Sequence, residues 1–334
     1  MESTETLKSG VLVTGATGFV GSTLVKALLK AGYPVTCMVR RTSDTRDLRK
    51  LPVRLWVGDL EKPGAAQDDL RGIRTVFHIA GAIKAVDRQE YLRVNQIGTR
   101  RLLETLAKNC PDVDRFIHLS SLAAAGPSPE NRGLKEGEKQ GPISWYGESK
   151  LKSEEEVLKF ANAFRVTILR PSAVYGPRDR ETLLMFRMIK RGFLFTPGRF
   201  TRRFSLIHVD DLSAALIGFN EHENPSGEVF FLSRPEIYTW EKVAGAIAQA
   251  MGRSYRQVAF PKKLAVLAGF TGDLWGRWSG RPATLNSQKI KELLQPSWLC
   301  DSSKAWTHLG LRPKIDLESG IRDTVRWYQE HGWL

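Results

Sequence analysis

Three side chains in the middle of the chain, Ser121, Tyr146 and Lys150, have the types and spacing needed to move a proton to or from an alcohol or carbonyl oxygen. Tyr146 and Lys150 are four residues apart, so on a helix they share a face, where the ammonium can lower the pKa of the phenol. Ser121 lies 25 residues upstream of Tyr146 and can hydrogen-bond the same substrate oxygen. Ser120 competes for this role, but neighbouring strand residues face opposite ways and only one of the two serines can reach the substrate. Tyr-x-x-x-Lys alone is a weak signal, so its meaning depends on its context.

A glycine-rich turn follows the first apolar run of the sequence. Residues 11–21 read VLVTGATGFVG, and a helical segment continues to Ala31. The three glycines permit a tight strand-to-helix turn and a close approach of the backbone to a pyrophosphate at the helix N-terminus. We expect a dinucleotide to bind here, although the same glycines could serve a tight turn without a ligand. The candidate contacts are Gly15, Thr17, Gly18, Phe19 and Val20.

Apolar runs of strand length alternate with helical segments along the first half of the chain. The expected strands are residues 11–14, 35–39, 54–57, 75–79, 115–120 and 166–169. The expected helices are residues 21–31, 91–108 and 145–164. This alternation predicts right-handed βαβ units and an α/β, doubly wound parallel sheet of the Rossmann type. In such a sheet Ser121 follows a strand, and Tyr146 and Lys150 lie on a helix.

Further short motifs occur in a fixed order along nearly the whole chain. They are GDL at 58–60, HIAG at 78–81, VNQIGT at 94–99, LRP at 169–171, VYGP at 174–177 and HVDDL at 208–212. With the glycine-rich turn and the Ser-Tyr-Lys set, these motifs resemble the extended short-chain dehydrogenase/reductase family. That family holds nucleotide-sugar epimerases and dehydratases, dihydroflavonol-type reductases and 3β-hydroxysteroid dehydrogenases.

The resemblance implies a division of the chain into two parts. Residues 7–171 and 204–233 would form the dinucleotide-binding Rossmann domain, and residues 172–203 and 234–334 a smaller mixed α/β substrate lobe. The family pattern also assigns the catalytic serine to Ser121. Further cofactor contacts implied by the resemblance are Asp59, Leu60, Ala80, Gly81, Asn95, Tyr146, Lys150, Pro171 and Val174. By the same analogy we expect a homodimer that pairs helices 91–108 and 145–164.

The end of the second expected strand bears on the choice of cofactor. An NAD-preferring Rossmann protein usually carries Asp or Glu there, whereas this chain has Arg40 and Arg41. Guanidinium groups bind a 2′-phosphate through charge-assisted hydrogen bonds. The sequence therefore predicts NADP in preference to NAD, unless the two arginines are only solvated loop charges.

The expected reaction is hydride transfer at the nicotinamide C4 coupled to proton transfer through Tyr146. Nucleotide-sugar enzymes of the family often carry Phe-Asn before VYGP, where this chain has Ser172 and Ala173, and an arginine at the position of Phe204. These departures favour a carbonyl reductase or alcohol dehydrogenase with a moderately hydrophobic substrate. An NAD-dependent nucleotide-sugar epimerase or dehydratase is the alternative, and a non-catalytic NADP-binding sensor is a third reading.

Composition agrees with a soluble intracellular enzyme. The 334 residues are 42% apolar, and three widely spaced cysteines indicate reduced thiols. Fifty Lys and Arg against 36 acidic residues give a net charge of +14, which favours anionic partners, but the basic residues are scattered and indicate no nucleic-acid motif. Residues 1–9 lack a secretory pattern, so we expect a cytoplasmic protein. The six histidines form no metal-type pair, and His78 and His118 are expected in the core.

Aromatic and long aliphatic residues are dense in the expected substrate lobe. They include Phe193, Phe195, Phe200, Phe260, Leu264, Leu267, Phe270, Leu274, Trp275 and Trp278. Such residues can line a pocket for a hydrophobic substrate, although they more often form the core of a small lobe. Residues 261–278, with Lys262, Lys263 and Arg277, could alternatively rest on an anionic membrane. We expect packing within the lobe rather than this membrane contact.

Overall fold

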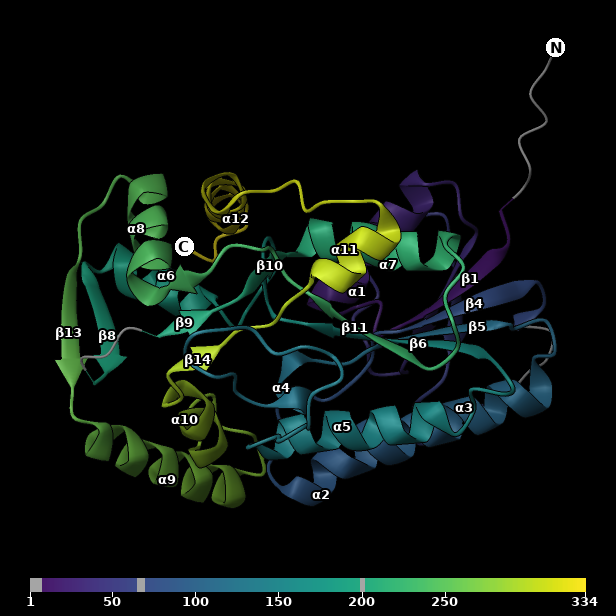
Figure 1. The fold of residues 1–334 in the computed structure, drawn as a ribbon, viewed down its shortest axis with the longest axis horizontal. Helices are drawn as coiled ribbons and strands as arrows, with labels where there is room; N and C mark the ends of the chain where they lie inside the picture. Colours follow the sequence, from purple (N-terminus) through teal and green to yellow (C-terminus); the bar gives the residue numbers. More distant parts are fainter. Residues whose placement is uncertain (1–7, 65–69, 199–201) are drawn as a thin grey trace, which may run out of the picture.

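The computed structural model describes residues 8–64, 70–198 and 202–334, so Phe200 lies outside the described residues. Its centre is a parallel sheet of seven strands in the order β11-β6-β5-β4-β1-β2-β3 (Figure 1). The strands are β1 Gly10–Thr14, β2 Val35–Val39, β3 Val53–Val57, β4 Ile73–His78, β5 Arg115–Leu119, β6 Arg165–Pro171 and β11 Glu228–Leu232. The strand order reverses beside β1, which confirms the predicted doubly wound Rossmann fold.

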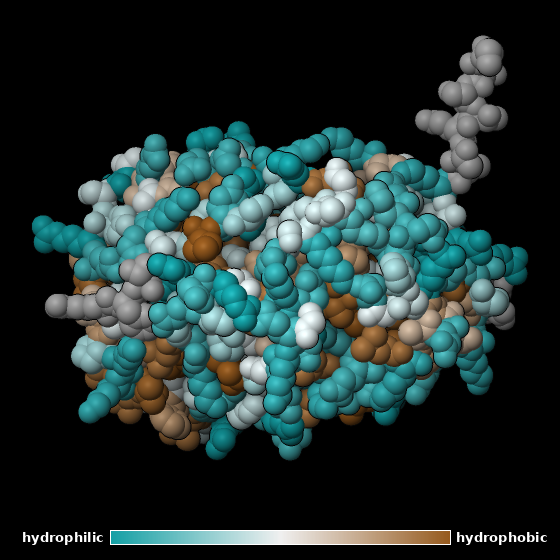
Figure 2. Space-filling model, in the orientation of Figure 1, coloured by the Kyte–Doolittle hydropathy of each residue, from teal (hydrophilic) through white to brown (hydrophobic). Residues whose placement is uncertain are grey.

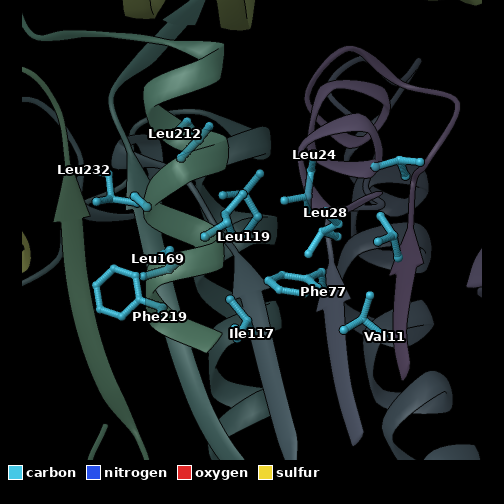
Figure 3. Packing of buried hydrophobic residues seen from close by; sticks show 14 of the residues in the cluster. Val11, Leu24, Leu28, Phe77, Ile117, Leu119, Leu169, Leu212, Phe219 and Leu232 are labelled. Atoms are coloured by element: carbon cyan, nitrogen blue, oxygen red, sulfur yellow. The ribbon is translucent and has the colours of Figure 1, made fainter. Parts of the chain in front are cut away.

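Helices cover both faces of this sheet (Figure 1). One face carries α1 Phe19–Lys30, α7 Val209–Glu221 and α11 Ser303–Leu309. The other carries α2 Arg88–Tyr91, α3 Gly98–Asn109 and α5 Trp145–Leu158. Figure 3 shows how the first face is filled, with Leu24 and Leu28 of α1 on the side of Phe77 of β4, and Leu212 and Phe219 of α7 on the side of Leu169 of β6. Burial of these apolar side chains fixes both helices on the sheet, so the loops at the strand ends stand on a rigid base.

The six strands expected from the sequence are all present, with ends within two residues of the prediction. Two expected helices differ. The helix expected to reach residue 164 ends at Leu158, because the chain turns through Ala163, whose N–H bonds to Phe160 O, in order to enter β6. The helix expected over 91–108 is interrupted by a π-helical turn over Leu92–Ile97, between α2 and α3.

The remaining elements form small sheets and helices beside one end of the main sheet (Figure 1). The short strands are β7 Ala173–Tyr175, β8 Phe193–Pro197, β9 Arg203–Phe204, β10 Leu206–His208, β12 Tyr238–Thr239, β13 Arg256–Phe260 and β14 Ser297–Trp298. The helices are α6 Leu183–Lys190, α8 Trp240–Met251, α9 Lys262–Ser279, α10 Ser287–Leu293 and α12 Leu317–Glu330, and α4 Leu122–Ala125 follows β5. Within the described residues, no helix combines the length and the apolar character needed to cross a bilayer.

Candidate active site

The turn between β1 and α1 is shaped to bring backbone close to a ligand. Gly15 has a φ of +71°, and a Cβ at this position would lie 2.8 Å from the backbone nitrogen of Ala80. A Cβ at Gly21 would lie 2.1 Å from Gly15 O, so both positions require glycine. Helix α1 begins after Gly18, and in the described structure no side chain caps it and no acidic residue stands in its first turn. The free N–H groups and the helix dipole therefore make this end suited to a phosphate.

Thr14 ties this turn to the end of the neighbouring strand β4. Its Oγ1 accepts hydrogen bonds from the N–H groups of Ile79 and Ala80, both at 3.1 Å, and lies 2.8 Å from His78 Nδ1. The other ring nitrogen of His78 lies 2.9 Å from Thr99 Oγ1. Burial, with a smaller effect of the Lys150 charge, lowers the pKa of His78 to about 3. His78 is therefore a neutral core residue that positions the strand ends, in agreement with the sequence-based expectation.

The two arginines predicted to select NADP stand at the end of β2. Both side chains are exposed, and within the described residues neither forms an ion pair. The backbone N–H of Arg40 donates to Ser43 Oγ at 3.1 Å, which shapes the turn. At the end of β3, Leu60 is buried and Asp59 Oδ1 accepts from the N–H of Glu61 at 3.0 Å. The guanidinium groups are thus available to an anion, whereas one oxygen of Asp59 is already engaged.

The two adjacent serines after β5 point to different partners. The Ser120 hydroxyl is buried and donates to the carboxylate of Glu154. Ser121 caps α4 by accepting from the N–H of Ala123 at 3.1 Å, and its hydroxyl lies close enough to the phenol of Tyr146 to lower the pKa of that phenol. The structure brings Ser121 and Tyr146 together, and this geometry favours Ser121 over Ser120 as the residue beside a reacting oxygen.

Lys150 lies one helical turn after Tyr146 on α5 and is buried. Its ammonium donates to Leu119 O at 2.7 Å, and a Cβ on Gly81 would lie 3.8 Å from its Nζ. Burial lowers the pKa of Lys150 to about 8, against the opposing effect of Glu154. The cation therefore sits between the end of β5 and the turn after β4, where the resemblance implies a contact of Lys150 with the cofactor.

The direction of the Tyr146 pKa differs from the prediction. Burial raises the pKa of Tyr146 to about 12; the Ser121 hydrogen bond lowers it, and the negative charge of Glu292 raises it further. Lys150 was expected to lower this pKa, but its ammonium is bonded to the Leu119 carbonyl, and burial of the phenol dominates. The protein's own groups therefore keep Tyr146 protonated at neutral pH.

Asn95 lies in the π-helical turn, and both the oxygen and the nitrogen of its side-chain amide form hydrogen bonds to neighbouring segments. Its Oδ1 accepts from the N–H of Ala82 at 2.7 Å, and its Nδ2 donates to Ala82 O at 3.0 Å and to Ser149 Oγ at 2.8 Å. This ties the turn that follows β4 to α5, so the structural role weighed for Asn95 is visible in its contacts. The last two candidate contacts, Pro171 and Val174, lie at the end of β6 and in β7.

A buried ion pair beneath Ser120 was not predicted. Arg170 on β6 donates to both carboxylate oxygens of Glu154 on α5, at 2.9 and 2.6 Å, and both side chains are buried. With the Ser120 hydroxyl, this pair locks α5 against β5 and β6. Its signals in the sequence are an arginine inside the apolar run ILRP and a glutamate one turn after Lys150, and either could equally mark a surface position.

Two ion pairs connect the segment after β7 to loops of the main sheet. Arg178, which has a φ of +76°, bonds to Asp47 at 3.0 Å, and Lys84 lies 2.6 Å from Glu181. These contacts were not predicted from the sequence. They hold the loop that carries the VYGP motif near the carboxyl ends of β2 and β4.

A hollow of about 1060 Å³ opens elsewhere on the protein, beside α11, and includes Arg132, Arg234, Ile237 and Trp306 in its lining. Its lining includes none of Ser121, Tyr146 or Lys150. The candidate active site is therefore assigned from the chemistry of the Ser121, Tyr146 and Lys150 cluster, which this hollow does not include. Among the described residues, no group of three or more His, Cys, Asp or Glu side chains is placed to hold a metal ion.

Comparison with known families assigns residues 11–232, from β1 to the end of β11, to the NAD dependent epimerase/dehydratase family. The chain belongs to this family. The protein is thus an extended short-chain dehydrogenase/reductase and an NAD-dependent oxidoreductase, epimerase or dehydratase by family, as the motifs indicated.

Two relatives match this chain over almost their full lengths. A ceramide reductase of Caulobacter vibrioides is 34% identical over 97% of this chain and 96% of its own. Sterol demethylase protein B of Methylococcus capsulatus is 30% identical over 97% of this chain and 99% of its own. Among solved structures, MoeE5 in complex with UDP-glucuronic acid and NAD superposes with a TM-score of 0.75 at 25% identity, covering 96% of this chain and 99% of that one.

Proposed function

We propose that this protein is an NADP(H)-dependent reductase that converts the ketone of a hydrophobic, lipid-like substrate to an alcohol. The observation that carries the proposal is the contact of Ser121 with a protonated Tyr146, one helical turn from the buried ammonium of Lys150. The two relatives named for ceramide and sterol chemistry support a lipid-like substrate.

The protonation state of Tyr146 suits ketone reduction. With a pKa raised to about 12, the phenol is a proton donor at neutral pH, as ketone reduction requires. Ser121 would donate a hydrogen bond to the same carbonyl oxygen and stabilise the negative charge that develops on it. The bound cofactor would supply the hydride.

The residues present fit a dinucleotide. The uncapped N-terminus of α1 and the close backbone at Gly15 would hold the pyrophosphate, and Lys150 would hold the nicotinamide ribose. Arg40 and Arg41 are exposed and carry no ion pair in the described structure, so both can bind a 2′-phosphate. The preference for NADP over NAD rests on these two arginines.

A nucleotide-sugar epimerase remains the second candidate, since UDP-glucose 4-epimerase of Vibrio cholerae is 26% identical over 96% of this chain. Such an enzyme would use the same Ser121, Tyr146 and Lys150, but it would retain its cofactor through the cycle. Ala173 and Phe204 at the positions of the family's sugar and diphosphate contacts argue against it. The intact Ser-Tyr-Lys set argues against a non-catalytic sensor.

Tyr146→Phe tests the proposal, with Tyr91→Phe as its control. The Tyr91 ring lies 6.2 Å from that of Tyr146, but its hydroxyl donates to the backbone oxygen of Ile83. We expect Tyr146→Phe to lower kcat for reduction of a long-chain ketone by about 10²-fold or more while NADPH binding persists. Tyr91→Phe should keep most of the activity. Full turnover by Tyr146→Phe would refute the proposed mechanism.

We further propose a cytoplasmic homodimer that pairs α3 and α5 of two copies. The dimer is supported by the position of these two helices, which lie side by side on one face of the sheet. The cytoplasmic location is supported by the three cysteines, which are buried and unpaired. The mass of the purified protein in solution tests the dimer, and a monomer at micromolar concentration would refute it.

A further inference from the structure

Helix α9 has one face built to pack closely on the protein. Gly269 is buried, and a Cβ there would lie 3.1 Å from the Ile290 side chain of α10. A Cβ on Gly272 would lie 1.9 Å from Leu285 O, and Gly276 and Ala265 are buried on the same side. Small residues at this helical spacing let α9 lie directly against α10 and the segment before it.

The opposite face of α9 is apolar and exposed. Leu267, Phe270, Leu274 and Trp278 recur at helical spacing with exposed fractions of 57%, 61%, 70% and 78%. Leu264 and Trp275 flank this face and are also exposed. In Figure 2, hydrophobic surface gathers at the lower left, where Figure 1 places α9. Large apolar side chains concentrated in this way mark an interaction surface rather than ordinary surface variation.

The strands that lead into α9 carry more apolar side chains toward solvent. β13 ends at Phe260, two residues before α9 begins, and it pairs with β8 in parallel. Phe195 and Val258 are register partners, and both are exposed, as is Phe193. The exposed apolar character therefore extends from α9 into the adjoining two-stranded sheet.

The charges around this face are basic. Lys263 stands at the start of α9 and Arg277 near its end. The one acidic residue of α9, Asp273, accepts from the N–H of Ser287 at 3.2 Å and so points toward α10, away from the apolar face. The whole protein carries a net charge of +14. An apolar stripe with interfacial tryptophans and flanking cations is complementary to an anionic lipid surface.

The face is also joined to the active site. α9 packs on α10, and α10 contacts the start of α5 through two hydrogen bonds. Ser144 donates to Glu292 at 2.7 Å, and the N–H of Trp145 donates to Gln288 at 3.2 Å. Trp145 immediately precedes Tyr146. A bilayer under α9 would therefore lie next to the lobe that faces the catalytic tyrosine.

We propose that α9 lies in the interface of an anionic lipid bilayer, with Leu267, Phe270, Leu274 and Trp278 among the acyl chains. The protein would then be a peripheral membrane enzyme that binds through one lobe without spanning the bilayer. The docking itself is independent of the proposed reductase activity. The consequence that a lipid ketone enters directly from the bilayer rests on that activity.

Vesicle flotation tests the docking. The full-length protein would be mixed with vesicles of phosphatidylcholine alone or with added phosphatidylglycerol, and its bound fraction measured. We expect binding to the anionic vesicles that falls as salt is raised. Leu274→Glu combined with Trp278→Glu should lower the partition coefficient about tenfold or more, because two large apolar side chains no longer enter the bilayer. The matched control is Leu184→Glu on α6, a leucine 56% exposed, which should bind as the wild type does.

Three further measurements separate the possible outcomes. Lys263→Glu with Arg277→Glu leaves the apolar face unchanged and should abolish the preference for anionic vesicles. NADPH binding by each variant checks its folding, and turnover of a water-soluble ketone checks the proposed reductase separately. Vesicle binding without turnover would contradict only the proposed function. Wild-type protein that does not bind anionic vesicles would overturn the docking. A mass in solution that falls when Leu274 and Trp278 are replaced would also overturn it, because a second copy of this chain would then cover that face.

Discussion

Replacing Lys150 with methionine should abolish turnover without lowering the free energy of unfolding. The fall of its pKa from 10.5 to about 8 means that the buried ammonium costs the native state about 3 kcal/mol at neutral pH. Methionine of similar length removes this cost, but it also removes the hydrogen bond to Leu119 O, and leaving that acceptor unpaired costs about 1–3 kcal/mol. We therefore expect Lys150→Met to be inactive and yet as stable as the wild type, or up to about 2 kcal/mol more stable, at pH 7.

The pH dependence gives a sharper form of this prediction. Between pH 8 and 10.5 the native protein has released the Lys150 proton while the unfolded chain still holds it, so the free energy of unfolding rises with pH in this window. From pH 7 to pH 9.5 the wild type should gain about 2 kcal/mol relative to Lys150→Met. The sign follows from a lysine pKa that is lower in the folded state than in the unfolded state.

Urea denaturation of wild type and variant at several pH values measures this difference directly, and equal m-values check that the two unfold alike. Lys152→Met is the control, because this lysine lies on the same helix but is partly exposed and pairs with Glu155. Its stability should run parallel to that of the wild type. If the difference between wild type and Lys150→Met stays constant across this range, Lys150 is not a buried cation, and the argument for a fixed positive charge at the cofactor site fails.

Other changes follow from the same contacts. Ser121→Ala should lower kcat about 10²-fold with little change in stability. Ser120→Ala should keep most of the activity but lower the free energy of unfolding by about 1–3 kcal/mol. The reverse pattern would show that Ser120 is the catalytic serine and Ser121 the structural one. Arg40→Ala should raise the Kd for NADPH about tenfold or more and leave that for NADH unchanged, and equal losses in calorimetric titrations would refute the 2′-phosphate contact. Arg170→Met should destabilise the protein by about 3–5 kcal/mol, because Glu154 is left buried without a partner, and a loss below about 1 kcal/mol in denaturation would show that the pair is not buried in solution.

The fold was accessible from the sequence because parallel strands buried on both faces read as uninterrupted apolar runs. The run at residues 35–39 coincides with β2, and the glycine-rich run places both β1 and the start of α1. Helix interruptions were not accessible in this way. The π-helical turn at Asn95 depends on hydrogen bonds to Ala82 and Ser149, which are made only when the strand ends and α5 have packed together.

The candidate site shows a similar division. Spacing predicted that Tyr146 and Lys150 share one face of a helix, and the family resemblance pointed to Ser121 as their partner. The direction of the Tyr146 pKa could not be obtained from spacing, because it depends on burial and on Glu292, which reaches the site from α10 far along the chain. The aromatic segment at 262–279 was expected chiefly as core, and the structure instead exposes one face of it as α9, because the opposite, glycine-lined face packs on α10.

The most direct test of the proposed reductase follows hydride from the cofactor to the product. The purified enzyme would receive NADPH that carries deuterium at both hydrogens of the nicotinamide C4, together with a long-chain ketone, and the lipid product would be analysed by mass spectrometry. The account predicts one deuterium on the new carbinol carbon and an equal amount of NADP released for each alcohol formed. A cofactor that stays bound, with no net oxidation and with turnover only of a nucleotide sugar, would contradict it and identify an epimerase.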